Sequence, residues 1–273
     1  MVAGPRVIHT FPGNNTIQGL ALLHNELYVL RHHNNKLDVH STIDFTRRRH
    51  VSVDGATGAA LEDIASCPHK RCIYVLNSTQ SEYETDFGIH RLGLDQSACK
   101  WPLDIQPLNV SVTRSSNLLV VCTLEDGKLE KLLLISSDNG DCLRTFTPRL
   151  DENYIIYYCM ELSDEHYVIS YSREGDDEGS GTVSHMDGEG EILHSSIDEV
   201  RMNRPRYMSS DSDQFVFVAV EHEKRVLLFD PSLKVVRSVT RGLDIDPSNL
   251  VYEELTRRLY IGSRNADVTV LQL

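Results

Sequence analysis

Four short apolar segments follow one another near the C-terminal end of the sequence: PRYM at 205–208, QFVFVA at 214–219, KRVLLFD at 224–230 and KVVRSV at 234–239. Each segment is rich in Val, Phe or Leu or alternates apolar with polar residues, and Asp, Ser, Glu or Pro separate one from the next. Runs of this length between turn-forming residues are typical of β-strands. The stretch therefore predicts four short strands joined by tight turns.

The same order of segments repeats along the rest of the chain. First strands are expected near Gly19, Asp63, Asn109, Cys159, Arg206 and Asn249, at spacings of 44, 46, 50, 47 and 43 residues. This is the period of a four-stranded propeller blade. Second strands align in the same register, at 26–30, 72–76, 118–122, 166–170, 215–219 and 258–262. The sequence thus predicts an all-β fold, a six-bladed β-propeller with four-stranded blades.

The two ends of the chain provide an independent test of this repeat. The sixth unit stops after the segment at 267–271 and lacks its outermost strand, whereas the residues at 6–13 precede the first unit and resemble the fourth-strand segment at 234–240. Pairing the two would close the ring and remove exposed sheet edges. We therefore expect one domain over 1–273, closed by the N-terminal strand.

The C-terminal units resemble NHL repeats, the building block of six-bladed propellers found behind tripartite-motif ubiquitin ligases and in stand-alone proteins. The residues that carry the resemblance lie at 203–208, 217–220, 224–231, 233–236, 246–250 and 258–262. The resemblance implies a rigid interaction module, and the substrate-recognition part of a ubiquitin ligase is one such role. Two units depart from the pattern through inserts between strands, at 174–181 and at Ser78–Phe87.

Composition limits the classes of function and location. The 273 residues carry a formal charge of −13, with 40% hydrophobic and 25% charged residues, which is typical of a folded soluble chain. Apolar runs are too short to cross a bilayer and the first residues do not form a signal peptide, so we expect a cytoplasmic protein with no membrane partner, monomeric as an isolated domain. The acidic balance also disfavours nucleic-acid binding over the whole surface.

Six cysteines are too few for a disulfide scaffold. Only Cys67 and Cys72 have suggestive spacing, with His69 between them. Burial at the ends of two paired strands is the favoured interpretation, while a disulfide across the hairpin and a metal site remain alternatives. The sequence leaves the redox state of the two cysteines open.

Propeller enzymes place metal ligands where the innermost strands begin. Glu62, Asn109 and Asn249 stand at such positions and partly match the Glu, Asn and Asp set that holds calcium in lactonase-like or esterase-like hydrolases, with Asp244 or Asp246 as additional charge. Polar residues are also the norm at these strand ends, where they face a solvated channel. We therefore favour a non-catalytic protein without a cofactor, with a metal-dependent hydrolase as an alternative.

A basic group on the loop that enters the fifth unit gives the strongest binding signal: Arg201, Arg204 and Arg206, with Tyr207 beside them. Such a surface can hold a protein or peptide partner, which we favour, or RNA, where Arg and Tyr contact phosphates and stacked bases. Arg47–Arg49 are expected on an outer strand, and the acidic run Glu174–Glu178 in a solvated loop, with calcium binding as an alternative. The predicted partner-contact residues are Arg201, Arg204, Arg206, Tyr207, Glu62, Asn109 and Asn249.

Overall fold

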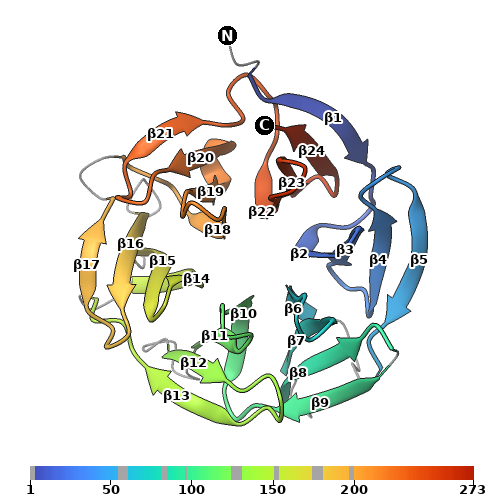
Figure 1. Cartoon of the computed structure of the whole chain (residues 1–273), viewed down its shortest axis with the longest axis vertical. Helices are drawn as coiled ribbons and strands as arrows, with labels where there is room; N and C mark the ends of the chain where they lie inside the picture. Colours follow the sequence, from blue (N-terminus) through green and yellow to red (C-terminus); the bar gives the residue numbers. More distant parts are fainter. Residues whose placement is uncertain are drawn as a thin grey trace. The chain divides into compact units, whose positions relative to one another are not determined.

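A computed structural model describes residues 4–54, 61–80, 85–95, 97–123, 131–150, 154–173, 181–196 and 200–273. These residues form six four-stranded antiparallel sheets, drawn in Figure 1 in sequence order from blue to red. The predicted all-β class with six four-stranded propeller blades is confirmed. The only helical element among them is one 3-10 turn at Glu221–Glu223, so none of the described segments is a helix long enough to span a bilayer.

Contacts between residues divide the chain into two compact units. One unit contains Gln18–Pro148 and Cys159–Glu161, and holds the first three sheets. Its strands are β2 (Ile17–Leu23), β3 (Glu26–Arg31), β4 (Lys36–Ser41) and β5 (Arg47–Ser52); β6 (Leu61–Cys67), β7 (Cys72–Gln80), β8 (Thr85–Gly93) and β9 (Ala98–Pro102); and β10 (Gln106–Val112), β11 (Leu118–Thr123), β12 (Lys131–Ile135) and β13 (Cys142–Phe146).

The other unit contains Met1–Ile17, Arg149–Tyr158 and Leu162–Leu273, and holds the remaining sheets. Its strands are β14 (Tyr154–Ser163), β15 (His166–Arg173), β16 (Thr182–Asp187) and β17 (Ile192–Ser195); β18 (Pro205–Ser210), β19 (Val216–Val220), β20 (Arg225–Phe229) and β21 (Val235–Ser238); and β22 (Pro247–Glu253), β23 (Arg258–Ser263), β24 (Val268–Gln272) and β1 (Arg6–Phe11). Each predicted first and second strand overlaps an observed one.

The N-terminal strand completes the last sheet, as the repeat predicts. β1 lies outermost in the order β1-β24-β23-β22 and pairs antiparallel with β24, with Val7 opposite Leu271 and Phe11 opposite Val268. The side chain of Phe11 is only 2% exposed, so β1 contributes to the core as well as to the ladder. Pairing with β1 covers an edge of β24 that would otherwise be free to associate with other chains.

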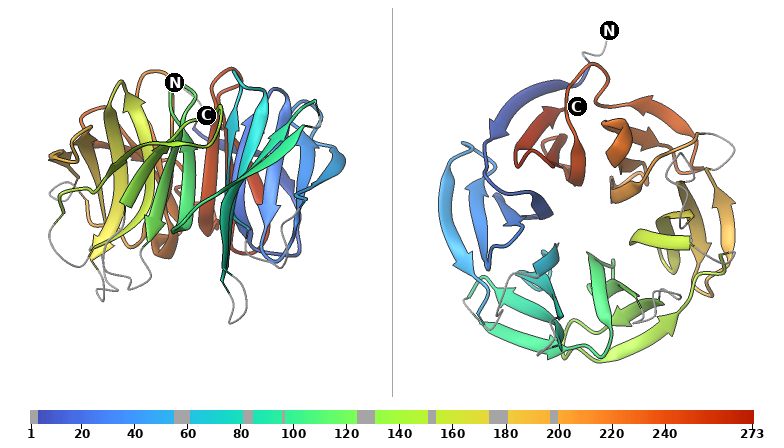
Figure 2. Two further views of the ribbon diagram at one scale, coloured as in Figure 1. Left: turned by 90° about the horizontal axis from the view of Figure 1, so that it is seen from below. Right: turned by 180° about the vertical axis from the view of Figure 1, so that it is seen from behind.

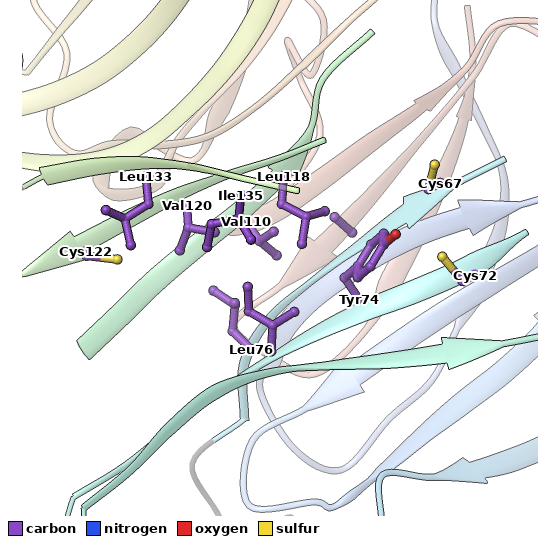
Figure 3. Close-up of a cluster of buried hydrophobic side chains, with 12 residues drawn as sticks. Cys67, Cys72, Tyr74, Leu76, Val110, Leu118, Val120, Cys122, Leu133 and Ile135 are labelled. Carbon is purple, nitrogen blue, oxygen red and sulfur yellow. The ribbon is translucent and has the colours of Figure 1, made fainter. Parts of the chain in front are cut away.

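The second and third sheets show how alternation builds the core. Side chains two residues apart on a strand face the same side of a sheet, and Cys72, Tyr74 and Leu76 of β7 lie on one such face. Figure 3 shows them packing toward side chains from β10, β11 and β12. Trp101 of β9 packs at the border of this cluster, with its ring centroid 5.9 Å from that of Tyr74.

The second sheet contains the two cysteines with suggestive spacing and one of the two inserts between strands. Cys67 and Cys72 lie opposite each other in the β6–β7 ladder as buried free thiols, so the favoured interpretation is confirmed and no disulfide joins them. The insert predicted at Ser78–Phe87 is wrong in part, because Ser78–Gln80 and Thr85–Phe87 extend the β7–β8 ladder. This long hairpin, coloured teal, is visible in the side view of Figure 2. The acidic run at 174–178 lies outside the described residues.

Candidate functional site

Most of the sheets carry a polar pair at the same place in the repeat. In each pair, a side chain near the beginning of the first strand contacts a side chain at or just beyond the end of the second strand. With the first-strand atom given first, the pairs are Gln18 Nε2 and His32 Nδ1 (2.7 Å), Glu62 Oε1 and Ser78 Oγ (3.2 Å), Tyr157 Oη and Ser172 Oγ (2.6 Å), and Arg206 Nη1 and Glu221 Oε1 (3.3 Å). The backbone position is thus shared, whereas the chemistry differs from sheet to sheet. The fifth sheet is distinctive because its pair is ionic.

Glu221 is the centre of the charged group in the fifth sheet. Its side chain is fully buried, directly after β19. Oε1 accepts hydrogen bonds from Arg206 Nη1 and from Arg264 Nε, the latter at 2.5 Å. Oε2 is buried and has no hydrogen-bond donor among the described residues. A buried carboxylate needs such compensating cations, so Glu221 fixes two arginines that belong to neighbouring sheets of the same unit.

These two arginines remain available to solvent. The side chains of Arg206 and Arg264 are 46% and 43% exposed, although each contacts Glu221. An arginine has five N–H donors, and a single carboxylate oxygen does not occupy them all. The pair therefore presents positioned donors and a net charge of +1 together with Glu221. This arrangement suits the carboxylates and main-chain carbonyls of a peptide.

The loop that enters the fifth sheet is held in place by the turn after β19. The Glu221 amide donates to Arg204 O (3.2 Å), the Asn203 amide donates to Glu223 Oε1 (2.8 Å), and Arg225 Nη2 donates to Arg201 O (3.3 Å). These bonds anchor the backbone of the loop while the Arg201 side chain stays exposed. A fixed loop reduces the entropy that is lost when a partner binds.

Aromatic side chains border this loop. The ring of Tyr207 on β18 lies 5.4 Å from the ring of Tyr158 on β14, and Tyr207 also packs against the core of its unit. Both rings are partly buried. Rigid aromatic groups beside arginines are typical of the centres of protein interfaces. We call Arg201, Arg204, Arg206, Arg264, Tyr158 and Tyr207 the arginine–tyrosine surface.

The remaining predicted site residues lie elsewhere. Glu62 on β6 and Asn109 on β10 belong to the other unit, where Asn109 is 7% exposed. Asn249 on β22 lies in the same unit as the arginine–tyrosine surface but is only 2% exposed. The structure therefore brings Arg201, Arg204, Arg206 and Tyr207 together, but it does not describe Glu62, Asn109 and Asn249 as one group. A role for these three in partner contact stays a prediction.

Asp63, next to Glu62, joins the second and third sheets. Its Oδ1 accepts a hydrogen bond from the Ile64 amide (2.8 Å) and its Oδ2 one from the Val110 amide (3.0 Å). Burial raises the pKa of Asp63 well above its usual value, and the two amide hydrogen bonds oppose that effect. No group of three or more His, Cys, Asp or Glu side chains among the described residues has the geometry of a metal site.

Sequence reasoning missed Glu221 and Arg264. Both stand directly after a second strand, 43 residues apart, which equals the spacing between Arg206 and Asn249 in the first strands of their two sheets. Opposite charges at equivalent repeat positions were a usable signal, because equivalent residues of neighbouring blades lie side by side. The apolar pattern that aligns the second strands ends just before these two positions, so it carries no information about their charges.

No protein-family model and no curated protein sequence matches this chain. Among solved structures, hydrazine synthase from Kuenenia stuttgartiensis is similar, with a TM-score of 0.67 and 14% sequence identity over 94% of this chain and 83% of that chain. At this identity the likeness supports the β-propeller fold alone.

Proposed function

We propose that this chain is a non-catalytic interaction module that binds a protein or peptide partner at the arginine–tyrosine surface. The observation that carries the proposal is the pair of half-exposed arginines, Arg206 and Arg264, which buried Glu221 holds in position. Burying the carboxylate of Glu221 costs free energy, and its contacts orient two arginines that face solvent. This arrangement favours recognition of a partner at these arginines. We further propose that the module acts in the cytoplasm as a single domain over residues 1–273.

The resemblance to NHL repeats supports a finer form of this proposal. In that form the partner is the substrate of a ubiquitin ligase, and the propeller is its recognition part. The loop at 201–204 supports a preformed binding surface, since two hydrogen bonds tie it to the turn after β19 and a third ties it to Arg225 at the start of β20. Glu62, Asn109 and Asn249 remain proposed contributors to partner binding.

Charge reversal tests the surface without disturbing the buried carboxylate. Arg206 is unsuitable, because a Glu at that position would face Glu221 directly. The double variant Arg201→Glu, Arg204→Glu reverses two charges of the entry loop, and Arg237→Glu, Arg241→Glu makes the same net change elsewhere in the fifth repeat. Both variants and the wild type would serve as bait in chemical cross-linking from cell extract, read by mass spectrometry.

We expect a partner protein to cross-link equally to the wild type and to the control variant. The amount cross-linked to the entry-loop variant should be about tenfold lower. Identical partner sets for all three baits would refute the arginine–tyrosine surface as the binding site. A partner signal removed by ribonuclease, with a steep dependence on salt, would show RNA binding instead. Divalent-dependent ester or lactone hydrolysis that Glu62→Gln abolishes would show a hydrolase.

A further inference from the structure

The outermost strand of the first sheet has an edge that is free to pair. β5 ends the order β2-β3-β4-β5, and β4 is its only partner among the described strands. The Val53 amide donates to Asn35 O across this ladder (2.9 Å). Because hydrogen-bonded pairs alternate along an antiparallel ladder, the backbone N–H and C=O of Ser52 and His50 point away from β4. Those groups therefore offer donors and acceptors to an additional strand.

The charge of β5 separates it from the other outermost strands. It reads RRRHVS, with Arg47, Arg48 and Arg49 in succession, and its first four residues are exposed. The sequences of β1, β9, β13, β17 and β21 each contain at most one Lys or Arg. Three adjacent arginines in a chain of net charge −13 are a local reversal of sign. Two copies of this edge would repel each other, whereas an acidic strand would be attracted.

The arginines of β5 are only partly neutralised. Arg48 contacts Asp44 at 3.1 Å in an exposed ion pair, and Arg47 forms no ion pair with a described residue. Arg49 donates to both carboxylate oxygens of Glu26 and to the Tyr28 hydroxyl (3.2 Å). These three hydrogen bonds use one N–H of Nη1 and both N–H groups of Nη2, so Nε–H and the second N–H of Nη1 remain as donors for an anion. Arg49 is thus fixed and still able to bind an anion.

A groove of about 550 Å³ lies beside the strand, between residues of the first and second sheets. Arg49 and Val51 line it from β5, and Ile73, Leu92 and Leu94 line it from the second sheet. Val51, Leu92 and Leu94 are partly buried against the core between these sheets. The groove can therefore accept one or two apolar side chains, with the guanidinium of Arg49 next to them.

We propose that β5 and this groove bind an extended acidic segment of a partner protein, which adds to the sheet as a further strand. Its backbone pairs with the outward groups of His50 and Ser52. Side chains two residues apart on a strand share a face, so an acidic side chain meets Arg49 while an apolar one, separated from it by one residue, enters the groove beside Val51. This site is independent of the arginine–tyrosine surface.

Three fluorescein-labelled peptides test this with the full chain by fluorescence anisotropy. The first repeats Glu-Ser-Val-Ser, which places Glu and Val on one face of a strand. The second repeats Glu-Val-Ser-Ser, with the same composition but Glu and Val on opposite faces, and the third repeats Lys-Ser-Val-Ser. We expect the first to bind at least about tenfold more tightly than the other two. Equal binding of the first two, or no binding of the first, would overturn the proposal.

Variants of the protein test the free edge. Ser52→Pro removes an outward N–H that β4 does not use, and a proline is tolerated at such an edge. We expect it to weaken the first peptide about tenfold, while Ser52→Ala changes binding less than about twofold. Arg49→Gln, which removes the charge without placing a second carboxylate against Glu26, should also weaken binding, whereas Arg237→Gln on β21 should not. Equal affinities of the Ser52→Pro and Ser52→Ala proteins would rule out strand addition.

A measurement on unmodified protein covers the case in which Ser52→Pro does not fold. Two derivatives of the first peptide are compared, one N-methylated at every odd-numbered amide and the other at every even-numbered amide. Only one of these two sets of amides faces β5 in an added strand. Strand addition therefore predicts that one methylated peptide loses binding and the other keeps it. Similar affinities of the two methylated peptides would show that side-chain attraction alone accounts for binding, and would overturn the proposal.

Discussion

Glu221 and Arg264 occupy the same position in consecutive repeats, and their side chains form an ion pair at 2.5 Å. The repeat therefore does more than stack apolar faces, because it also brings opposite charges together at one register. The buried carboxylate depends on Arg264 from the next sheet and on Arg206 from its own. The side chain of Glu221 therefore both stabilises the protein and positions the exposed arginines of the arginine–tyrosine surface.

Replacing Glu221 by Gln should destabilise the protein by about 1–3 kcal/mol. The amide keeps the size and one acceptor but leaves two arginines without their shared negative charge; their partial exposure keeps the loss below that of a fully buried pair. Urea unfolding measures the change. Glu223→Gln serves as control, since the Glu223 side chain is 27% exposed where that of Glu221 is fully buried, and we expect its loss to be less than about 1 kcal/mol. Equal losses would contradict the central role of Glu221.

The stability of the protein should depend on pH through Asp63. Burial raises its pKa in the folded state, so as the pH rises the unfolded chain gives up the Asp63 proton first. The stabilisation from the protonated acid is complete below the unfolded pKa of about 4 and is lost as the pH rises through the folded pKa. Wild-type stability relative to Asp63→Asn should therefore decrease as the pH rises above about 4, until the folded protein has also lost the Asp63 proton.

Urea unfolding at several pH values measures this difference. The difference in stability between the wild type and Asp63→Ala should depend on pH in the same way. Asp63→Ala should be less stable than Asp63→Asn at every pH, because it leaves the Ile64 and Val110 amides without their acceptor. A difference that does not change with pH would show that Asp63 has the same proton affinity in the folded and unfolded states.

Two glycines with the same backbone conformation should differ in their tolerance of alanine. Gly140 and Gly242 have φ values of 81° and 83°. A Cβ at Gly140 would lie 2.3 Å from Trp101 Cγ, whereas a Cβ at Gly242 would meet nothing within 4 Å. Gly242→Ala should therefore cost about 1 kcal/mol from backbone strain alone, and Gly140→Ala about 2 kcal/mol more. Thermal unfolding distinguishes them, and equal losses would contradict the close packing of Trp101.

Only two of the six cysteines should react rapidly with a thiol reagent in the native protein. Cys99 and Cys142 are exposed, while Cys67, Cys72, Cys122 and Cys159 are buried. Burial raises the pKa of Cys122 to about 12 and the pKa of Cys159 well above its usual value, so little thiolate forms there. Labelling should give two fast thiols, and four more after denaturation. The double variant Cys99→Ser, Cys142→Ser should show no fast labelling, and residual fast reaction would indicate local opening.

The repeat made the fold predictable, because each strand has its own apolar pattern and the pattern recurs six times. It also located β1 in the last sheet, since the fourth-strand pattern is missing from the end of the chain and present at its beginning. The hairpin of β7 and β8 was predicted too short, because Ser78–Gln80 and Thr85–Phe87 are mostly polar and pair through their backbones. Backbone pairing of polar residues leaves little trace in an apolar pattern.

The candidate site was predictable only in part, for a physical reason. Arg201, Arg204, Arg206 and Tyr207 stand out because they are close in sequence. Arg264 and Tyr158 reach the same surface from other repeats, so their proximity depends on how neighbouring sheets pack. The groove beside Val51 was also missed, because it forms between residues of two sheets and no single segment contains it.

The pairing of β1 with β24 sets an order of events during synthesis. β1 is made before the other strands of the six sheets, whereas its partner strand β24, which includes Leu271, is made after all of them. The five sheets that contain β2 to β21 are each built from neighbouring segments and can form while the chain grows, since their loops are short. The sixth must close a loop of almost the whole chain. Until β24 has emerged, β1 lacks its partner strand, and at this stage chaperones and misassembly would compete with completion of the sixth sheet.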